Sequence, residues 1–157
     1  MAGADFPETA LSGYGPTHVE SFNNYAWNLL DDHTRTICAL AGSLNLWVIL
    51  GSTRQIDGQL PRNCAHVISN TGVIVGSYDK QRLYHREKDY YSPGHEPLVV
   101  HINGVTCGFL ICYDNCYPAL YEVYRNRGVG LLFHSFHNAG NHHVTSINNL
   151  MRAMLIV

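Results

Sequence analysis

The stretch from Gly108 to Pro118, G-F-L-I-C-Y-D-N-C-Y-P, carries the residue best suited to nucleophilic chemistry, Cys112. The apolar run before Cys112 predicts a buried strand, and Pro118 suits the first turn of a helix. A cysteine between a strand and a helix lies near helix N–H groups, which favour a thiolate. The alternative is an inert buried thiol, because free cysteine is among the most buried residue types. The rest of the chain has to decide between these two interpretations.

Length and composition predict one globular domain over residues 1–157. The chain is 46% hydrophobic and 14% charged, with a formal net charge of −2. This balance suits a packed core, and without a basic run neither nucleic acid nor a membrane is expected as a partner. The five cysteines are odd in number and form no C-x-x-C pair. We therefore expect a reducing, cytoplasmic location.

The two ends of the chain are unusual for a domain. It opens almost at once on A-D-F-P-E and closes on the apolar run L-M-R-A-M-L-I-V. Domains seldom end on their own core residues, so we expect part of a longer domain. No apolar signal-peptide core precedes Pro16, and the longest apolar run, from Leu44 to Leu50, is too short for a bilayer span.

Periodicity and turn residues indicate a layered arrangement of helices and strands. Thr17 to Glu20 has the spacing of a capping box, and apolar residues then recur at helical spacing as far as Gly42. A second helix is expected over residues 118–127. Strands are expected at residues 44–51, 64–69, 73–78, 98–102, 105–111 and 129–133. The order predicts an α/β or α+β sandwich.

Three loops hold the other candidate residues. Glu8 lies in a Pro- and Gly-punctuated loop, where a solvated carboxylate is the ordinary interpretation. Glu87 lies in the long polar loop 84–97, and long loops in domains are often functional. The loop 134–143 contains four histidines, but their spacing fits no common structural zinc pattern. Pocket lining is the favoured interpretation, and a metal-binding module built on His134, His137, His142 and His143 is the weaker alternative.

Three segments now stand in order along the chain: Phe6-Pro7-Glu8 with Ser12-Gly13-Tyr14, then Tyr78-Asp79-Lys80 with Leu83 and Glu87, then Gly108 to Asp114 with Tyr117-Pro118. In that order they resemble the signature regions of the nitrilase (carbon–nitrogen hydrolase) superfamily. Each is weak alone, but three in the right order are specific. The resemblance runs from Phe6 to Arg152-Ala153. It implies a four-layer α-β-β-α sandwich, and the family domain is longer than this chain.

The resemblance also implies a catalytic triad of Glu8, Lys80 and Cys112. Cys112 would attack the carbon of an amide or nitrile, and Glu8 would carry the proton. Lys80 and the backbone N–H of Tyr113 would stabilise the negative charge that develops. Glu87 matches a second glutamate that orients the lysine and the substrate.

The chain departs from the family pattern at positions that bear on the substrate. Arg82 replaces the usual histidine after the lysine, and Cys116 is an extra thiol. The segment containing His134, His137 and Asn138, which we expect to face the site, replaces a commonly proline-containing one.

The sequence therefore predicts a thiol hydrolase of linear amides or N-carbamoyl compounds that releases ammonia through a thioester. Its partner would be a small-molecule amide, and no metal or other cofactor is expected. A catalytically inactive truncated remnant of the family is the alternative. From the family's habits we also expect a homo-oligomer.

Overall fold

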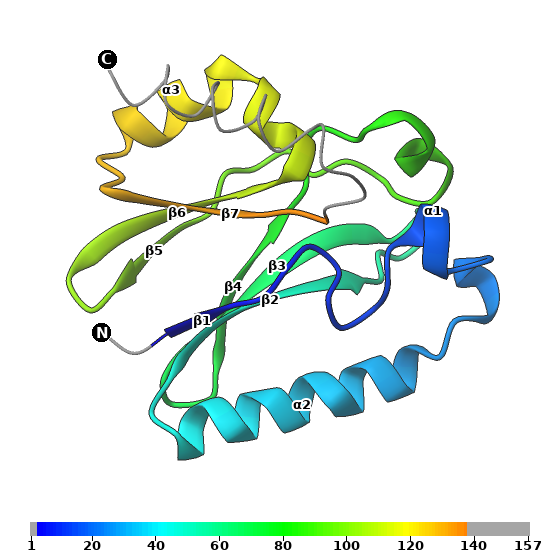
Figure 1. The fold of residues 1–157 in the computed structure, drawn as a ribbon, viewed down its shortest axis with the longest axis horizontal. Helices are drawn as coiled ribbons and strands as arrows, with labels where there is room; N and C mark the ends of the chain where they lie inside the picture. The colour runs from blue at the N-terminus through cyan, green and yellow to red at the C-terminus, as the bar shows by residue number, and fades with distance from the viewer. Residues whose placement is uncertain (1–2, 138–157) are drawn as a thin grey trace.

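Two β-sheets stack face to face, with one helix on each outer side (Figure 1). This computed structural model describes residues 3–137. One sheet has the order β1 (Gly3–Asp5), β2 (Trp47–Arg54), β3 (Arg62–Ile68), β4 (Ile74–Asp79). The other has the order β5 (Val99–Ile102), β6 (Val105–Ile111), β7 (Leu131–Ser135). With α2 (Trp27–Ser43) below and α3 (Pro118–Asn126) above, the layers form the expected α-β-β-α sandwich.

The strand pairing is mixed. β1 runs parallel to β2, and β6 runs parallel to β7, whereas the other neighbouring strands are antiparallel. The β5–β6 hairpin turns at Asn103 and Gly104, whose φ angles are 49° and 83°. Two consecutive left-handed residues match the tight turn that an Asn-Gly pair predicts.

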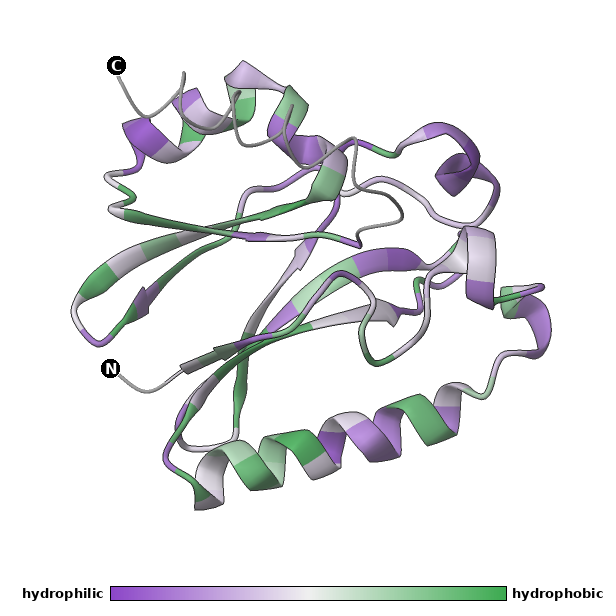
Figure 2. Ribbon diagram, viewed as in Figure 1, coloured by the Kyte–Doolittle hydropathy of each residue, from purple (hydrophilic) through white to green (hydrophobic). Residues whose placement is uncertain are grey.

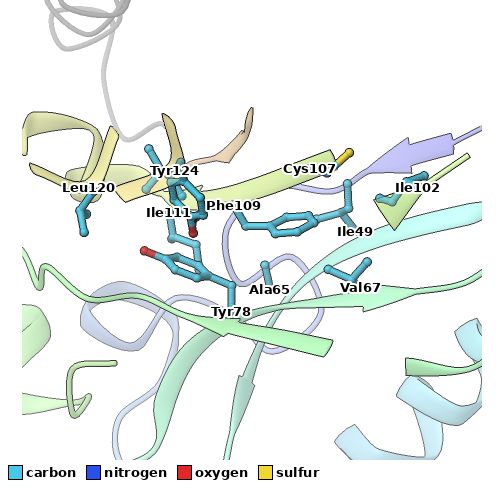
Figure 3. Packing of buried hydrophobic residues seen from close by; sticks show 11 residues of the cluster. Ile49, Ala65, Val67, Tyr78, Ile102, Cys107, Phe109, Ile111, Leu120 and Tyr124 are labelled. Carbon is cyan, nitrogen blue, oxygen red and sulfur yellow. The ribbon is translucent and has the colours of Figure 1, made fainter. Parts of the chain in front are cut away.

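The main core fills the space between the two sheets. Figure 3 shows Phe109 from β6 above Ala65 and Val67 from β3, with Tyr78 from β4 alongside. All four side chains are at most 2% exposed. Phe109 also stacks on Phe133 of β7, with ring centroids 5.6 Å apart. Figure 2, which colours the chain by hydropathy, shows that β6 and β7, which contribute to this core, are mostly hydrophobic.

The first predicted helix begins later than expected. The capping-box interpretation of Thr17 to Glu20 is wrong: α1 (Gly15–His18) ends there, and the chain becomes extended at Val19. A short 3₁₀ helix, η1 (Phe22–Asn24), follows before α2 begins at Trp27. Phe22 is 8% exposed and packs against Tyr91, with ring centroids 5.5 Å apart. The burial of Phe22 therefore outweighs the helical spacing of apolar residues that predicted a helix starting at Thr17.

Strand boundaries differ from the expected ones by up to three residues. β2 begins at Trp47 because residues 44–46 close the preceding helix. Leu46 N donates to Ala41 O at 2.9 Å, and Asn45 has a left-handed φ of 52°. In the described residues, no helix is both long and apolar enough to cross a membrane.

Candidate active site

Four of the predicted residues come together, three of them from segments that follow strands and the fourth from a short helix. Glu8 follows β1, Lys80 follows β4 directly, and Cys112 follows β6 directly. Glu87 comes from η2 (His85–Asp89), a 3₁₀ helix within the long polar loop.

Glu8 is held by a close crossing of its loop over β2. A Cβ on Gly51 would lie 1.9 Å from the carbonyl oxygen of Pro7, so only glycine permits this approach. On the far side of the crossing, Leu11 N donates to Gly51 O at 3.1 Å. Thr9, directly after Glu8, takes a left-handed φ of 52°. The Glu8 carboxylate is therefore aimed inward, and the residue is only 2% exposed.

Lys80 lies between two carboxylates. Its Nζ donates to Glu8 Oε1 at 2.7 Å and to Glu87 Oε1 at 2.6 Å, and its side chain is fully buried. The backbone on either side is fixed as well: Lys80 N donates to Asn63 O at 2.9 Å, and Gly94 N donates to Lys80 O at 2.8 Å. A lysine with its charge out of water needs such partners.

Glu87 is buried and is not a surface carboxylate. It is 0% exposed, and its Oε2 accepts from Tyr84 N at 2.5 Å. The Tyr14 hydroxyl also hydrogen-bonds to Glu87. Burial raises the pKa of Glu87, against the pull of Lys80, and the charge of Glu8 adds to the rise.

Glu8 is the better satisfied of the two carboxylates. Asn63 Nδ2 donates to its Oε1 at 2.7 Å, and the backbone N of His137 donates to its Oε2 at 2.9 Å. Burial works to raise the pKa of Glu8. The charge and hydrogen bond of Lys80, with the bonds from His137 and Asn63, nevertheless hold it below the ordinary value. Glu8 is thus ionised at neutral pH and can accept a proton.

Cys112 is a protonated thiol at rest, which corrects the expectation that helix N–H groups would favour a thiolate. Burial, together with the charges of Glu8 and Glu87, raises the pKa of Cys112 to about 12, although the charge of Lys80 works to lower it. The thiol hydrogen-bonds to Glu8. Two carboxylates already share the single ammonium of Lys80, so a thiolate would add further negative charge in a buried place.

The turn after β6 is strained and held by Asp114. Cys112 has a φ of 45°, a left-handed conformation that a side chain disfavours. It opens a 3₁₀ helix, η3 (Cys112–Cys116). The buried Asp114 carboxylate accepts from Ile111 N at 3.1 Å and from Arg82 N at 2.8 Å. It also accepts from the Tyr78 hydroxyl at 2.9 Å. Asp114 therefore ties the turn of Cys112 to the segment that carries Lys80.

The two described histidines of the 134–143 loop lie at the site. His134 Nε2 is 3.0 Å from Cys112 O, and because a carbonyl only accepts, Nε2 carries the proton. The ring of His137 stacks on Tyr14, with centroids 4.9 Å apart. Within residues 3–137, no group of three or more His, Cys, Asp or Glu side chains is placed to hold a metal. Asn138, His142 and His143 lie outside the described residues.

The side chain and the backbone of Tyr113 have different surroundings. Its ring packs against those of Tyr84 and Tyr117, with centroids 5.0 Å and 5.4 Å away. Its side chain is thus occupied by these neighbours. Only the backbone N–H next to Cys112 is left for the role that the resemblance implies.

Three residues at the site were not among the predicted ones: Tyr14, Asn63 and Asp114. Tyr14 and Asp114 belong to the signature segments, so their presence in those motifs was the available signal. Asn63 is a polar residue inside a strand and is 1% exposed. A lone asparagine in an apolar strand shows nothing of its partner, because Glu8 is 55 positions away in the chain.

Cys116 cannot close a disulfide with Cys112 in this arrangement. Four residues of 3₁₀ helix rise by roughly 8 Å, beyond the Cα separation that a disulfide spans. Both cysteines are free thiols, and Cys116 is exposed. Cys116 is therefore a natural control for experiments on Cys112.

Known proteins that resemble this chain belong to the family that its signature segments suggested. Residues 5–154 match the model of the carbon-nitrogen hydrolase family. The chain is 27% identical to a nitrilase of Pyrococcus abyssi over 130 residues, covering 82% of this chain and 49% of that protein. It is 29% identical to the bovine omega-amidase NIT2 over 136 residues, covering 80% of this chain and 48% of that protein. The chain thus spans about half the length of these relatives.

Solved structures agree on the fold. A cysteine-to-alanine variant of the Nesterenkonia AN1 amidase superposes with a TM-score of 0.86 at 22% identity, covering 97% of this chain and 58% of the amidase. A carbon-nitrogen hydrolase of Helicobacter pylori G27 gives a TM-score of 0.77 at 18% identity, covering 98% and 56%. Another variant of the Nesterenkonia amidase carries the acetamide moiety of fluoroacetamide at its active-site cysteine. With the signature segments, the sandwich and the family model in agreement, this chain belongs to the carbon-nitrogen hydrolase family.

Proposed function

We propose that the chain is an amidase-like thiol hydrolase in which Cys112 is the nucleophile, Glu8 the proton carrier and Lys80 the electrostatic stabiliser. One observation carries this proposal. The Lys80 ammonium bridges two buried carboxylates, and one of these, Glu8, also accepts a hydrogen bond from the Cys112 thiol. Nucleophile, base and cation thus share one buried cluster.

The first half of the reaction forms a thioester. The Cys112 proton passes to Glu8 as Sγ bonds to the carbonyl carbon, so a free thiolate need not accumulate. Negative charge moves to the substrate oxygen, which Lys80 and the Tyr113 N–H stabilise. One such donor is worth about 2.7–4 kcal/mol in the transition state. Glu8 then protonates the departing nitrogen, the C–N bond breaks, and ammonia leaves.

The second half releases the acyl group as an acid. Glu8 takes a proton from water, whose oxygen attacks the thioester carbon. The C–S bond breaks, and the proton held by Glu8 returns to Sγ. Glu87 would keep Lys80 in place through both halves, because it accepts a second hydrogen bond from the ammonium.

The substrate class that we propose is a linear amide or an N-carbamoyl compound. The amidase and omega-amidase relatives support it, and a small-molecule amide would be the partner. His137 and Tyr14 stack beside Glu8 and Glu87, so they are the side chains we expect to contact the acyl group.

The test is ammonia release by the purified chain from aliphatic amides, ω-amides, N-carbamoyl amino acids and nitriles. Cys112→Ala should abolish ammonia release from whichever class of compound the wild type hydrolyses. Cys116→Ala should still release ammonia from that class. Fluoroacetamide should label the peptide that contains Cys112 and leave the Cys116→Ala variant equally labelled. A folded, monodisperse chain that neither releases ammonia nor accepts the label would instead support the inactive-remnant alternative.

A further inference from the structure

A cavity of about 580 Å³ lies outside the candidate active site. Its walls come from η1, the start of α2, the β2–β3 connection and η2. Figure 1 shows the connection from α1 to α2 and the segment after β4 at the same end of the molecule. None of Glu8, Lys80, Glu87 and Cys112 lines the cavity. Its volume is within the range of small-molecule sites.

The floor of this cavity is aromatic. Phe22, Trp27 and Tyr90 line it. Phe22 and Trp27 stack with ring centroids 5.6 Å apart, and Phe22 meets Tyr90 edge to face at 6.5 Å. Rings held against one another in this way form a preformed apolar surface, and they suit an apolar or aromatic group of a ligand.

The rim of the cavity carries charges of both signs. Arg86 and Asp89 come from η2, and Glu20 comes from the segment before η1. All three residues are exposed. The ion pairs found among residues 3–137 join other side chains, so these three charges are not committed to one another. They can therefore bind charged groups of a ligand.

We propose that this cavity binds a free α-amino acid with an apolar or aromatic side chain. Arg86 would bind the carboxylate, since a guanidinium matches a carboxylate with two parallel hydrogen bonds. Glu20 and Asp89 would bind the ammonium group, and the aromatic floor would take the side chain. A phosphate ester would meet two carboxylates, and a polyamine would meet the guanidinium, so a ligand with both charges fits best.

The position of η2 links this cavity to the active site. Arg86 and Asp89 face the cavity, whereas Glu87, between them in the chain, is buried against Lys80. A ligand that joins Arg86 to Glu20 restrains the short helix that carries Glu87. Occupancy of the cavity should therefore stabilise the Lys80–Glu87 contact.

Calorimetric titration of the full chain with L-phenylalanine tests this proposal. Three analogues each remove one feature: 3-phenylpropanoate lacks the ammonium group, phenethylamine lacks the carboxylate, and glycine lacks the side chain. Arg86→Gln and Glu20→Gln remove rim charges. Lys88→Gln is the matched control, because Lys88 is exposed on the same helix but does not line the cavity.

The expected result is one binding site for L-phenylalanine with at least tenfold weaker binding of each analogue. Arg86→Gln and Glu20→Gln should each weaken L-phenylalanine at least tenfold, and Lys88→Gln should not. Protein alkylated at Cys112 should bind it as well as untreated protein does. Absence of binding to folded protein, equal affinity in Arg86→Gln, or loss of binding on Cys112 alkylation would each overturn the proposal. None of these readouts depends on catalytic activity.

Discussion

Two consecutive residues of the chain, Asp79 and Lys80, each form the centre of a three-charge cluster. Asp79 accepts from Arg54 Nε at 2.7 Å and Nη2 at 2.5 Å, and from Arg62 Nη1 at 3.2 Å. Lys80 donates to Glu8 and Glu87. One cluster is an anion between two cations, and the other is a cation between two anions. The two clusters differ in how deeply they are buried, and this difference determines what each of them can do.

The Asp79 cluster is partly open to water. The Arg54 side chain is 39% exposed and that of Asp79 is 11% exposed, whereas no side chain of the Lys80 cluster exceeds 1%. Water can solvate the partners of Asp79 if a bond breaks, so this cluster ties β2, β3 and β4 together at modest gain. The Lys80 cluster has no such substitute, and the charges of its carboxylates raise the pKa of the neighbouring Cys112 thiol. Burial therefore distinguishes the structural Asp79 cluster from the Lys80 cluster, for which we propose a catalytic role.

The largest effect is expected from Lys80→Met. It leaves two buried carboxylates without their cation, so the free energy of unfolding should fall by about 3–5 kcal/mol. Ammonia release should also be lost. Urea denaturation measures the first effect, and a loss below about 1 kcal/mol would contradict the role given to burial.

The next effect is a steeper loss of stability in alkali caused by Cys112. The folded state raises its thiol pKa from 9.0 to about 12. The unfolded chain therefore releases this proton first, and stability falls as pH rises between these values. The wild type should lose up to about 4 kcal/mol more than Cys112→Ala over this window, at about 1.36 kcal/mol per pKa unit. Parallel stability curves for the two proteins would refute the raised pKa.

A smaller effect is expected from Asp79→Asn. The amide keeps part of the hydrogen bonding to Arg54, and water reaches the rest, so we expect a cost of about 1–2 kcal/mol. Activity should stay within a few-fold of the wild type, because the Asp79 carboxylate binds Arg54 and Arg62, neither of which belongs to the candidate site. A loss of activity as large as that of Lys80→Met would erase the distinction between the two clusters.

The smallest effect tests the strained turn after β6. Cys112→Gly should be more stable than Cys112→Ala by about 0.5–1 kcal/mol, because only glycine adopts a positive φ without cost. Both variants lack the thiol, so the comparison isolates the backbone. Thermal unfolding of the two variants checks it, and a more stable alanine variant would show that the turn stores no strain.

Much of the sheet architecture could be predicted from the sequence. The Asn103-Gly104 turn and the apolar run before Cys112 are local signals, and both gave the right elements. The start of α2 could not be predicted in this way. It depends on Phe22 packing against Tyr91, a contact between residues far apart in the chain.

The same contrast between local signals and long-range contacts applies to the candidate site. Motif order pointed to Glu8, Lys80 and Cys112, and the structure places them in one cluster. The protonation of Cys112 was not predictable, because it depends on burial and on the summed charge of three distant segments. Asn63 was missed for the same reason, since its partner Glu8 lies on another strand end.

The most direct test of this account is the pKa of the Cys112 thiol in the folded protein. Thiolate absorbance of the wild type minus that of Cys112→Ala should show no titration up to about pH 10. Glu8→Gln removes one negative charge and the hydrogen bond to the thiol, so the same difference should titrate at a lower pH. A wild-type thiolate at neutral pH, or a higher pKa in Glu8→Gln, would contradict the claim that the buried cluster keeps the thiol of Cys112, the proposed nucleophile, protonated.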